Sequence, residues 1–116
     1  MNVYTYQIAK YKLVIEKGIK PLDITVKSGA YQLAPTWLMV MGHKKGIISS
    51  DEYTEAYLSM LEQSLIDNPE FFKWFFQLEE VALGCYCRAG NFCHRHLLVE
   101  WLETKTEVIY CGEISK

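Results

Sequence analysis

The stretch Val81-Ala-Leu-Gly-Cys-Tyr-Cys-Arg-Ala-Gly-Asn-Phe-Cys-His-Arg-His-Leu-Leu-Val-Glu-Trp-Leu102 decides the fold that the sequence predicts. It opens with an apolar run of strand length, passes through Gly90-Asn91, and continues with apolar residues at nearly helical spacing. This order predicts a strand, a tight loop and a helix. In open α/β sheets ligands bind at the carboxyl ends of the strands, because free N–H groups and the positive end of the helix dipole meet there. A ligand that carries a phosphate or carboxylate group is expected there.

Length, composition and charge narrow the class of protein. The chain has 116 residues, 50% of them hydrophobic and 14% aromatic, which predicts one compact domain over 1–116. The formal net charge of −2 argues against nucleic acid as a partner, because binding its backbone needs a dense basic surface. No apolar stretch approaches the roughly 20 residues of a membrane span. Since the amino terminus also lacks the regions of a signal peptide, we expect a cytoplasmic protein without a membrane partner.

The first third of the chain predicts a strand, a helix and a second strand. Residues 3–6 are rich in β-formers, an apolar and lysine-punctuated segment follows as far as Gly18, and 21–26 is again β-rich. With the late strand and helix, this order predicts a small Rossmann-like α/β fold, a three-layer sandwich around a mostly parallel sheet of about four strands. The second strand would end at Thr25, Lys27 and Ser28, beside the loop that follows Cys87.

The middle of the chain predicts helices. Residues 30–46 are irregular and are interpreted as an insertion covering the pocket, with Thr36 capping a short helix through Met41 and an exposed basic loop at 43–45. Ser49 and Glu52 form a capping-box pattern before a helix with apolar positions from 53 to 65.

Asn68 and Pro69 then start a helix whose residues 71–76 are almost all aromatic. Because a chain this small is not expected to bury all of these rings by itself, we expect a homodimer. Residues 107–111 predict a last strand, and residues 112–116 a tail.

The chain has four cysteines, and three of them, Cys85, Cys87 and Cys93, fall within nine residues. Without a signal peptide they are expected as reduced thiols, metal ligands or catalytic groups. One alternative is a zinc-stapled interaction domain held by these three thiols and one histidine, for which His96 is the candidate. His94 and His96 lie about 200° apart around a helix, so they would not serve one metal together. No cofactor fingerprint occurs, and no cofactor is expected.

A second alternative is an enzyme with a cysteine nucleophile. A thiol at a helix amino terminus near arginine and histidine has a lowered pKa, as a reactive thiolate requires. Cys85 or Cys93 would then be the nucleophile and His94 the acid or base, acting on a nucleotide or a nucleic-acid-derived substrate. The Cys-x5-Arg loop of cysteine phosphatases is not met, because position 91 is Asn and position 93 is Cys.

The leading hypothesis is a binding module for a phosphate-bearing nucleotide. Arginine donates two hydrogen bonds to phosphate, and flat rings stack on bases. Asp23, a carboxylate within an apolar strand, needs a partner such as Arg95 or Lys27. The residues expected to hold the ligand are Tyr6, Thr25, Lys27, Ser28, Tyr86, Arg88, Cys93, His94 and Arg95.

Several segments resemble the family known as domain of unknown function 488, or DUF488. These are 23–28, 33–37, 50–54 and 81–86, followed by Phe92-Cys-His-Arg-His-Leu-Leu98, with the most specific mark at Cys85, Cys93, His94 and Arg95. The resemblance implies a Rossmann-like fold and a pocket at the Cys-His-Arg turn, and it supplies no reaction. By analogy with other small α/β proteins of phages, the ligand would be a nucleotide or ADP-ribose-like signalling molecule sequestered as an anti-defence sponge.

Overall fold

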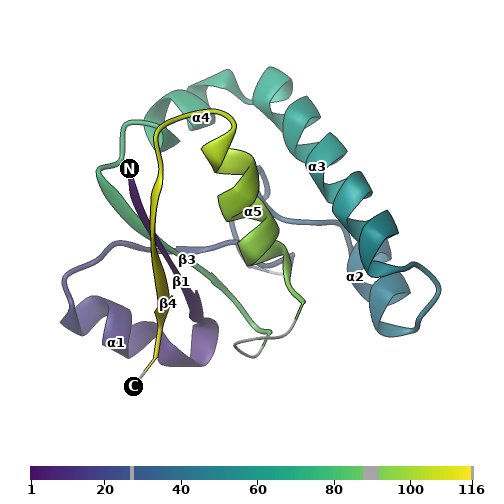
Figure 1. Cartoon of the computed structure of the whole chain (residues 1–116), viewed down its shortest axis with the longest axis horizontal. Coiled ribbons are helices and arrows are strands. Elements are labelled where there is room, and N and C mark those ends of the chain that lie inside the picture. The colour runs from purple at the N-terminus through teal and green to yellow at the C-terminus, as the bar shows by residue number, and fades with distance from the viewer. Residues whose placement is uncertain (27, 88–91, 116) are drawn as a thin grey trace.

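The computed structural model describes residues 1–26, 28–87 and 92–115, and shows four parallel strands in one sheet (Figure 1). The strands are β1 (Asn2–Gln7), β2 (Pro21–Asp23), β3 (Glu80–Cys85) and β4 (Ile109–Ile114), in the spatial order β2-β3-β1-β4. All three pairings are parallel. The expected α/β architecture is therefore confirmed, with the apolar run from Val81 in a central strand.

Helices cover both faces of this sheet and give three layers (Figure 1). A 3-10 turn (Ile8–Lys10) and α1 (Tyr11–Glu16) pack on one face. On the other face lie α2 (Trp37–Lys44), α3 (Ser50–Asp67), α4 (Pro69–Phe75) and α5 (His94–Glu103). In β3 the side chains of Val81, Leu83 and Cys85 point to the larger core beneath α3 and α5, while Ala82 belongs to the α1 side, as the alternation of a strand requires.

The helix starts follow the capping patterns in the sequence. Thr36 Oγ1 accepts a hydrogen bond from the Met39 amide at 3.2 Å, and Ser49 forms a full capping box with Glu52. Both expected helices are confirmed, and α2 continues past Met41 to Lys44, so residues 43 and 44 are helical rather than part of a loop. Asn68 was wrongly expected to cap α4, because its side chain bonds Ser64 and Tyr31 instead.

The carboxyl ends of β2 and β4 differ most from the expected strand boundaries. Strand β2 ends at Asp23 rather than 26, because the Asp23 carboxylate accepts hydrogen bonds from the Thr25 amide and the Ser28 hydroxyl and so turns the chain. Strand β4 continues to Ile114, so the expectation of a tail after residue 111 is wrong. A register shift against β1, with Gly112 at φ 101°, lets the strand run on beside residues 4–6.

The aromatic helix α4 contributes mainly to the core of its own chain. Phe72 and Phe75 are buried, and Phe72 packs edge-on to Trp101 of α5 with ring centroids 5.8 Å apart. Trp74 stays 42% exposed. The rings therefore require no second copy to be largely covered, and the homodimer stays a prediction. Among the described residues, no helix is long and apolar enough to cross a bilayer.

Gly84 lies against the ring of Tyr6, and we expect Gly84→Ala to lower the free energy of unfolding by about 1–3 kcal/mol. An added methyl group would overlap the ring, with the tyrosine oxygen 2.7 Å away. Tyr6 is 2% exposed, so it has no room to move. Urea denaturation measures the loss. Gly42→Ala is the control, because a methyl group there would meet Ile48 at an ordinary 3.4 Å; equal losses in the two variants would contradict this packing.

Candidate functional site

A cavity of about 410 Å³ lies at the carboxyl end of the sheet, between strands β2 and β3 and helices α2 and α3. Chain segments from four parts of the fold meet there, as expected for an open parallel sheet. We call it the thiol cavity. The residues that line it are Thr25, Val26, Pro35, Trp37, Val40, His43, Lys44, Tyr53, Cys85, Tyr86, Cys87, Phe92, Cys93 and His94.

Aromatic rings form much of the wall of the thiol cavity. The ring centroids of His43 and Phe92 are 4.8 Å apart, and Phe92 meets Tyr53 edge-on at 5.4 Å. Tyr53 is buried, and desolvation raises the pKa of its hydroxyl, which keeps it neutral. Trp37 and Tyr86 also line the cavity and are 54% and 62% exposed. The cavity therefore offers flat apolar surfaces to a ligand.

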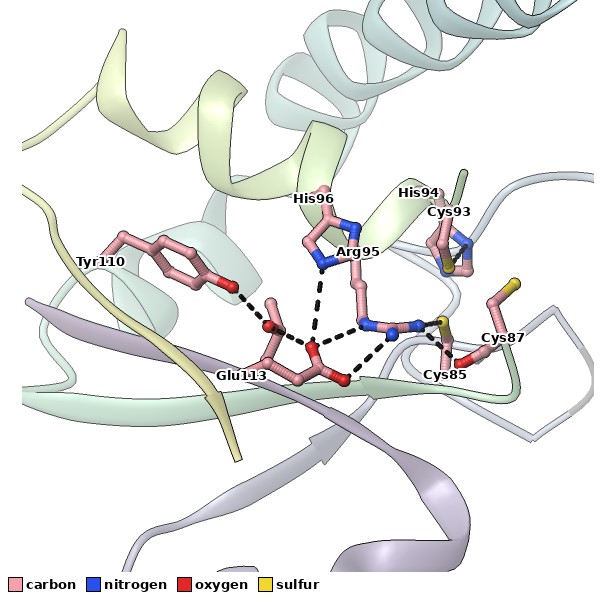
Figure 2. Close-up of polar contacts among 9 residues, drawn as sticks. Cys85, Cys87, Cys93, His94, Arg95, His96, Tyr110 and Glu113 are labelled. Carbon is pink, nitrogen blue, oxygen red and sulfur yellow. Dashed lines mark hydrogen bonds and ion pairs between the residues drawn. The ribbon is translucent and has the colours of Figure 1, made fainter. Parts of the chain in front are cut away.

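Sulfur and imidazole groups form another part of the lining (Figure 2). Cys85 at the end of β3, Cys93 before α5 and His94 in its first turn are all buried, and their ligand atoms lie within 4.8 Å of one another. Cys87 is partly exposed, and hydrogen bonds from Cys85 and Cys93 lower the pKa of its thiol. We call these four residues the thiol cluster.

The imidazole of His94 has a defined orientation. Its Nε2 lies 2.7 Å from the carbonyl oxygen of Ile24, and since a carbonyl only accepts, Nε2 carries the proton. Burial lowers the pKa of the ring, so it is neutral at physiological pH. Its unprotonated Nδ1 is 3.7 Å from Cys93 Sγ and accepts a hydrogen bond from that thiol, so the Nδ1 lone pair points to the thiol cluster.

Arg95 does not enter the thiol cavity, contrary to our expectation that it would hold the ligand. Its side chain is fully buried and forms an ion pair with Glu113 of β4, with Nη2 3.0 Å and Nε 3.2 Å from the two carboxylate oxygens. The remaining nitrogen, Nη1, donates to Cys85 Sγ at 2.8 Å and to the Cys87 carbonyl at 3.0 Å. The guanidinium therefore contacts Cys85 and Cys87 and supports the thiol cluster without lining the cavity (Figure 2).

His96 lies on a different side of α5 from His94. Its Nε2 is 3.7 Å from Glu113, and the side chain is 37% exposed (Figure 2). The two histidines diverge, as the helical spacing predicts. The metal set expected from the sequence includes His96, whereas the histidine whose ligand atom lies within 4.8 Å of the Cys85 and Cys93 sulfurs is His94.

The other expected ligand residues are only partly brought together. Thr25 and Tyr86 line the thiol cavity with Cys93 and His94. Ser28 is instead bonded to Asp23 and Thr25. Arg95, one of the two partners expected for Asp23, pairs with Glu113. Tyr6 packs on the opposite face of the sheet, with α1. Lys27 and Arg88, and the loop residues Gly90 and Asn91, lie outside the described residues.

Sequence reasoning missed four contributors to this region. His43 and Lys44 were expected in an exposed loop, and Tyr53 was interpreted only as an apolar position of a helix, yet all three line the cavity. Glu113 was placed in a tail. The one signal in the sequence was the charge of Arg95, whose position among apolar helix residues requires a carboxylate partner somewhere in the chain.

Comparison with known proteins identifies the family. A family model described as "Active DUF488-N3 subclade" matches residues 17–106, which contain every residue that lines the thiol cavity. Searches of curated proteins and of solved structures found no match. The resemblance carried by the Cys-His-Arg segment is confirmed.

Replacing Arg95 with methionine should lower the free energy of unfolding by about 3 kcal/mol, because it removes one partner of a buried ion pair. The matched control is Lys105→Met, which removes the surface pair with Glu62, whose side chain is 52% exposed. That loss should be below about 1 kcal/mol. Urea denaturation of both variants gives the comparison, and equal small losses would contradict a structural role for Arg95.

Proposed function

This chain belongs to the DUF488 family, and we propose that it binds a small planar ligand of the nucleoside or nucleotide class in the thiol cavity. The observation that carries the proposal is the ring-lined cavity at the carboxyl end of the parallel sheet. Its volume of about 410 Å³ is in the range of sites for small molecules, roughly 300–1,000 Å³.

The wall of the cavity supports a planar ligand. Trp37 at the start of α2 and Tyr86 after β3 keep more than half of their surface exposed while lining the cavity, so their rings are accessible to a ligand. A base that stacks on an aromatic side chain gains about 1–3 kcal/mol. Nucleobases present π-faces of this kind together with polar edges, which the imidazole of His43 in the cavity lining would meet.

Lys44 supports a charged end on the ligand. It lies in the last turn of α2 and lines the cavity, and its side chain is exposed. Arg95 has no such role, because Glu113, Cys85 and Cys87 use its hydrogen bonds. A phosphate would therefore lie toward α2, not over the amino terminus of α5 as the sequence led us to expect.

A second candidate function is turnover of the same ligand by a cysteine nucleophile. Cys87 is the observation that favours it: among the three thiols it is the one with exposed surface, whereas Cys85 and Cys93 are 1% and 4% exposed. The thiolate of Cys87 would form a bond to an electrophilic carbon of the ligand while the bond from that carbon to its leaving group breaks, and water would then displace the thiolate and release the product. This replaces Cys85 and Cys93, the nucleophiles expected from the sequence.

Nucleosides and nucleotides should raise the melting temperature of the protein and quench its tryptophan fluorescence. A ligand at 100 times its Kd adds about 2.7 kcal/mol to stability. Trp37→Ala should weaken binding about tenfold or more, because stacking is lost. Trp74→Ala is the control, since this half-exposed tryptophan lies on α4, outside the cavity. The proposal is wrong if no such compound shifts the melting temperature, or if the two variants bind alike.

Denaturing the protein after incubation with a bound compound separates the two candidate functions. A binding module returns the compound intact, and an enzyme returns a product. If product forms, Cys87→Ser should abolish its formation while Cys111→Ser, at an exposed position of β4, leaves it unchanged. Chromatography and mass spectrometry of the released compound give the readout, and equal turnover in Cys87→Ser would exclude this nucleophile.

A further inference from the structure

The thiol cluster has the composition and spacing of a metal site. We propose that Cys85, Cys93 and His94 bind one zinc ion in the lining of the thiol cavity. The ligand atoms of these three buried residues lie within 4.8 Å of one another. Around a tetrahedral zinc, with Zn–S of about 2.3 Å and Zn–N of about 2.0 Å, ligand atoms are about 3.5–3.8 Å apart. Cys93 Sγ and His94 Nδ1, at 3.7 Å, already have this separation.

The hydrogen bond of His94 to the main chain prepares its ring for a metal. Nε2 donates to the Ile24 carbonyl at 2.7 Å, which leaves the Nδ1 lone pair directed to the sulfurs. Metal-bound histidines almost always donate their other N–H in this way, because the bond fixes the tautomer and the orientation of the ring. A core histidine packed for shape alone would need no sulfur neighbours at its second nitrogen.

Arg95 provides the corresponding support for Cys85. Its Nη1 donates to Cys85 Sγ at 2.8 Å while Glu113 accepts from Nε and Nη2. The thiolate is the form of cysteine that binds zinc, and a guanidinium donor at this distance would orient and support the Cys85 sulfur as a ligand.

The charges of the buried groups also balance. Zinc with two thiolates and a neutral imidazole has no net charge, and the Arg95–Glu113 pair next to it is neutral as well. Burial without net charge avoids the large cost of isolated ions in a low-dielectric interior.

Three protein ligands leave the fourth position of a tetrahedral zinc open. All three ligands line the thiol cavity, so this position faces the space that a ligand would occupy, with the Cys87 sulfur alongside. Catalytic zinc sites have three protein ligands and one open position, whereas structural sites are closed by four. The site also joins the end of β3 to the start of α5, across residues 86–92. The zinc proposal does not depend on the nucleotide proposal, because metal binding is measured without any nucleotide.

Metal analysis of protein purified without chelators tests the proposal. Wild-type protein should contain about one equivalent of zinc, and cobalt(II) added to the metal-free protein should give the charge-transfer absorption of thiolate–cobalt bonds. Zinc below about a tenth of an equivalent, together with no such absorption on cobalt addition, overturns the proposal. Both readouts use the wild-type chain, so they do not depend on whether any variant folds.

Substitutions identify the ligands. Cys85→Ser, Cys93→Ser and His94→Ala should each lower zinc affinity at least about tenfold, with circular dichroism to show that the variants are folded. The chain offers controls of the same residue types outside the cluster, Cys111→Ser and His96→Gln, and these should retain one equivalent. Cys87→Ser should also retain zinc; its loss there, or an unchanged affinity in all three ligand variants, would contradict this ligand set.

Discussion

The buried guanidinium of Arg95 is the constraint on which the arrangement of this molecule depends. A charge with no exposed surface is stable only with partners, and here the partners come from three places in the chain. Glu113 holds it from β4, Cys85 from the end of β3, and the Cys87 carbonyl from the segment after it. This one side chain therefore fixes how the last strand, a central strand and α5 lie relative to one another.

The side chains in the first turn of α5 point in different directions and have different roles. Successive residues of a helix point about 100° apart, so His94 faces the thiol cavity, Arg95 points beneath it, and His96 lies toward Glu113 and solvent (Figure 2). The first turn of α5 therefore gives the cavity a neutral imidazole, while the charge of Arg95 pairs with Glu113 outside the lining. This division explains why Arg95 does not line the cavity although His94, its neighbour in the sequence, does.

The elements of the fold were largely predictable, because their signals are local. The box of Ser49 with Glu52 and the cap at Thr36 each depend on hydrogen bonds across three residues, and the alternation and helical spacing around Val81–Leu102 need only the chain itself. The failures occurred where a distant partner decides the outcome. Strand β4 was predicted too short because pairing with β1 extends it. Asn68 does not cap α4, because its side chain bonds Ser64 and Tyr31 instead.

In the site, too, the features set by neighbours along the chain were predictable and those set by distant partners were not. By itself, the sequence determined the order of strands and helices, the concentration of thiols and histidines after β3, and the divergence of His94 from His96, since all of these depend on neighbours along the chain. Only the tertiary structure decided that Arg95 pairs with Glu113, that His94 bonds Ile24, seventy residues away, and that His43 and Tyr53 wall the cavity. The physical reason is that a buried polar group bonds to the partner that packing places next to it. The spacing of residues along the sequence does not indicate which partner that is.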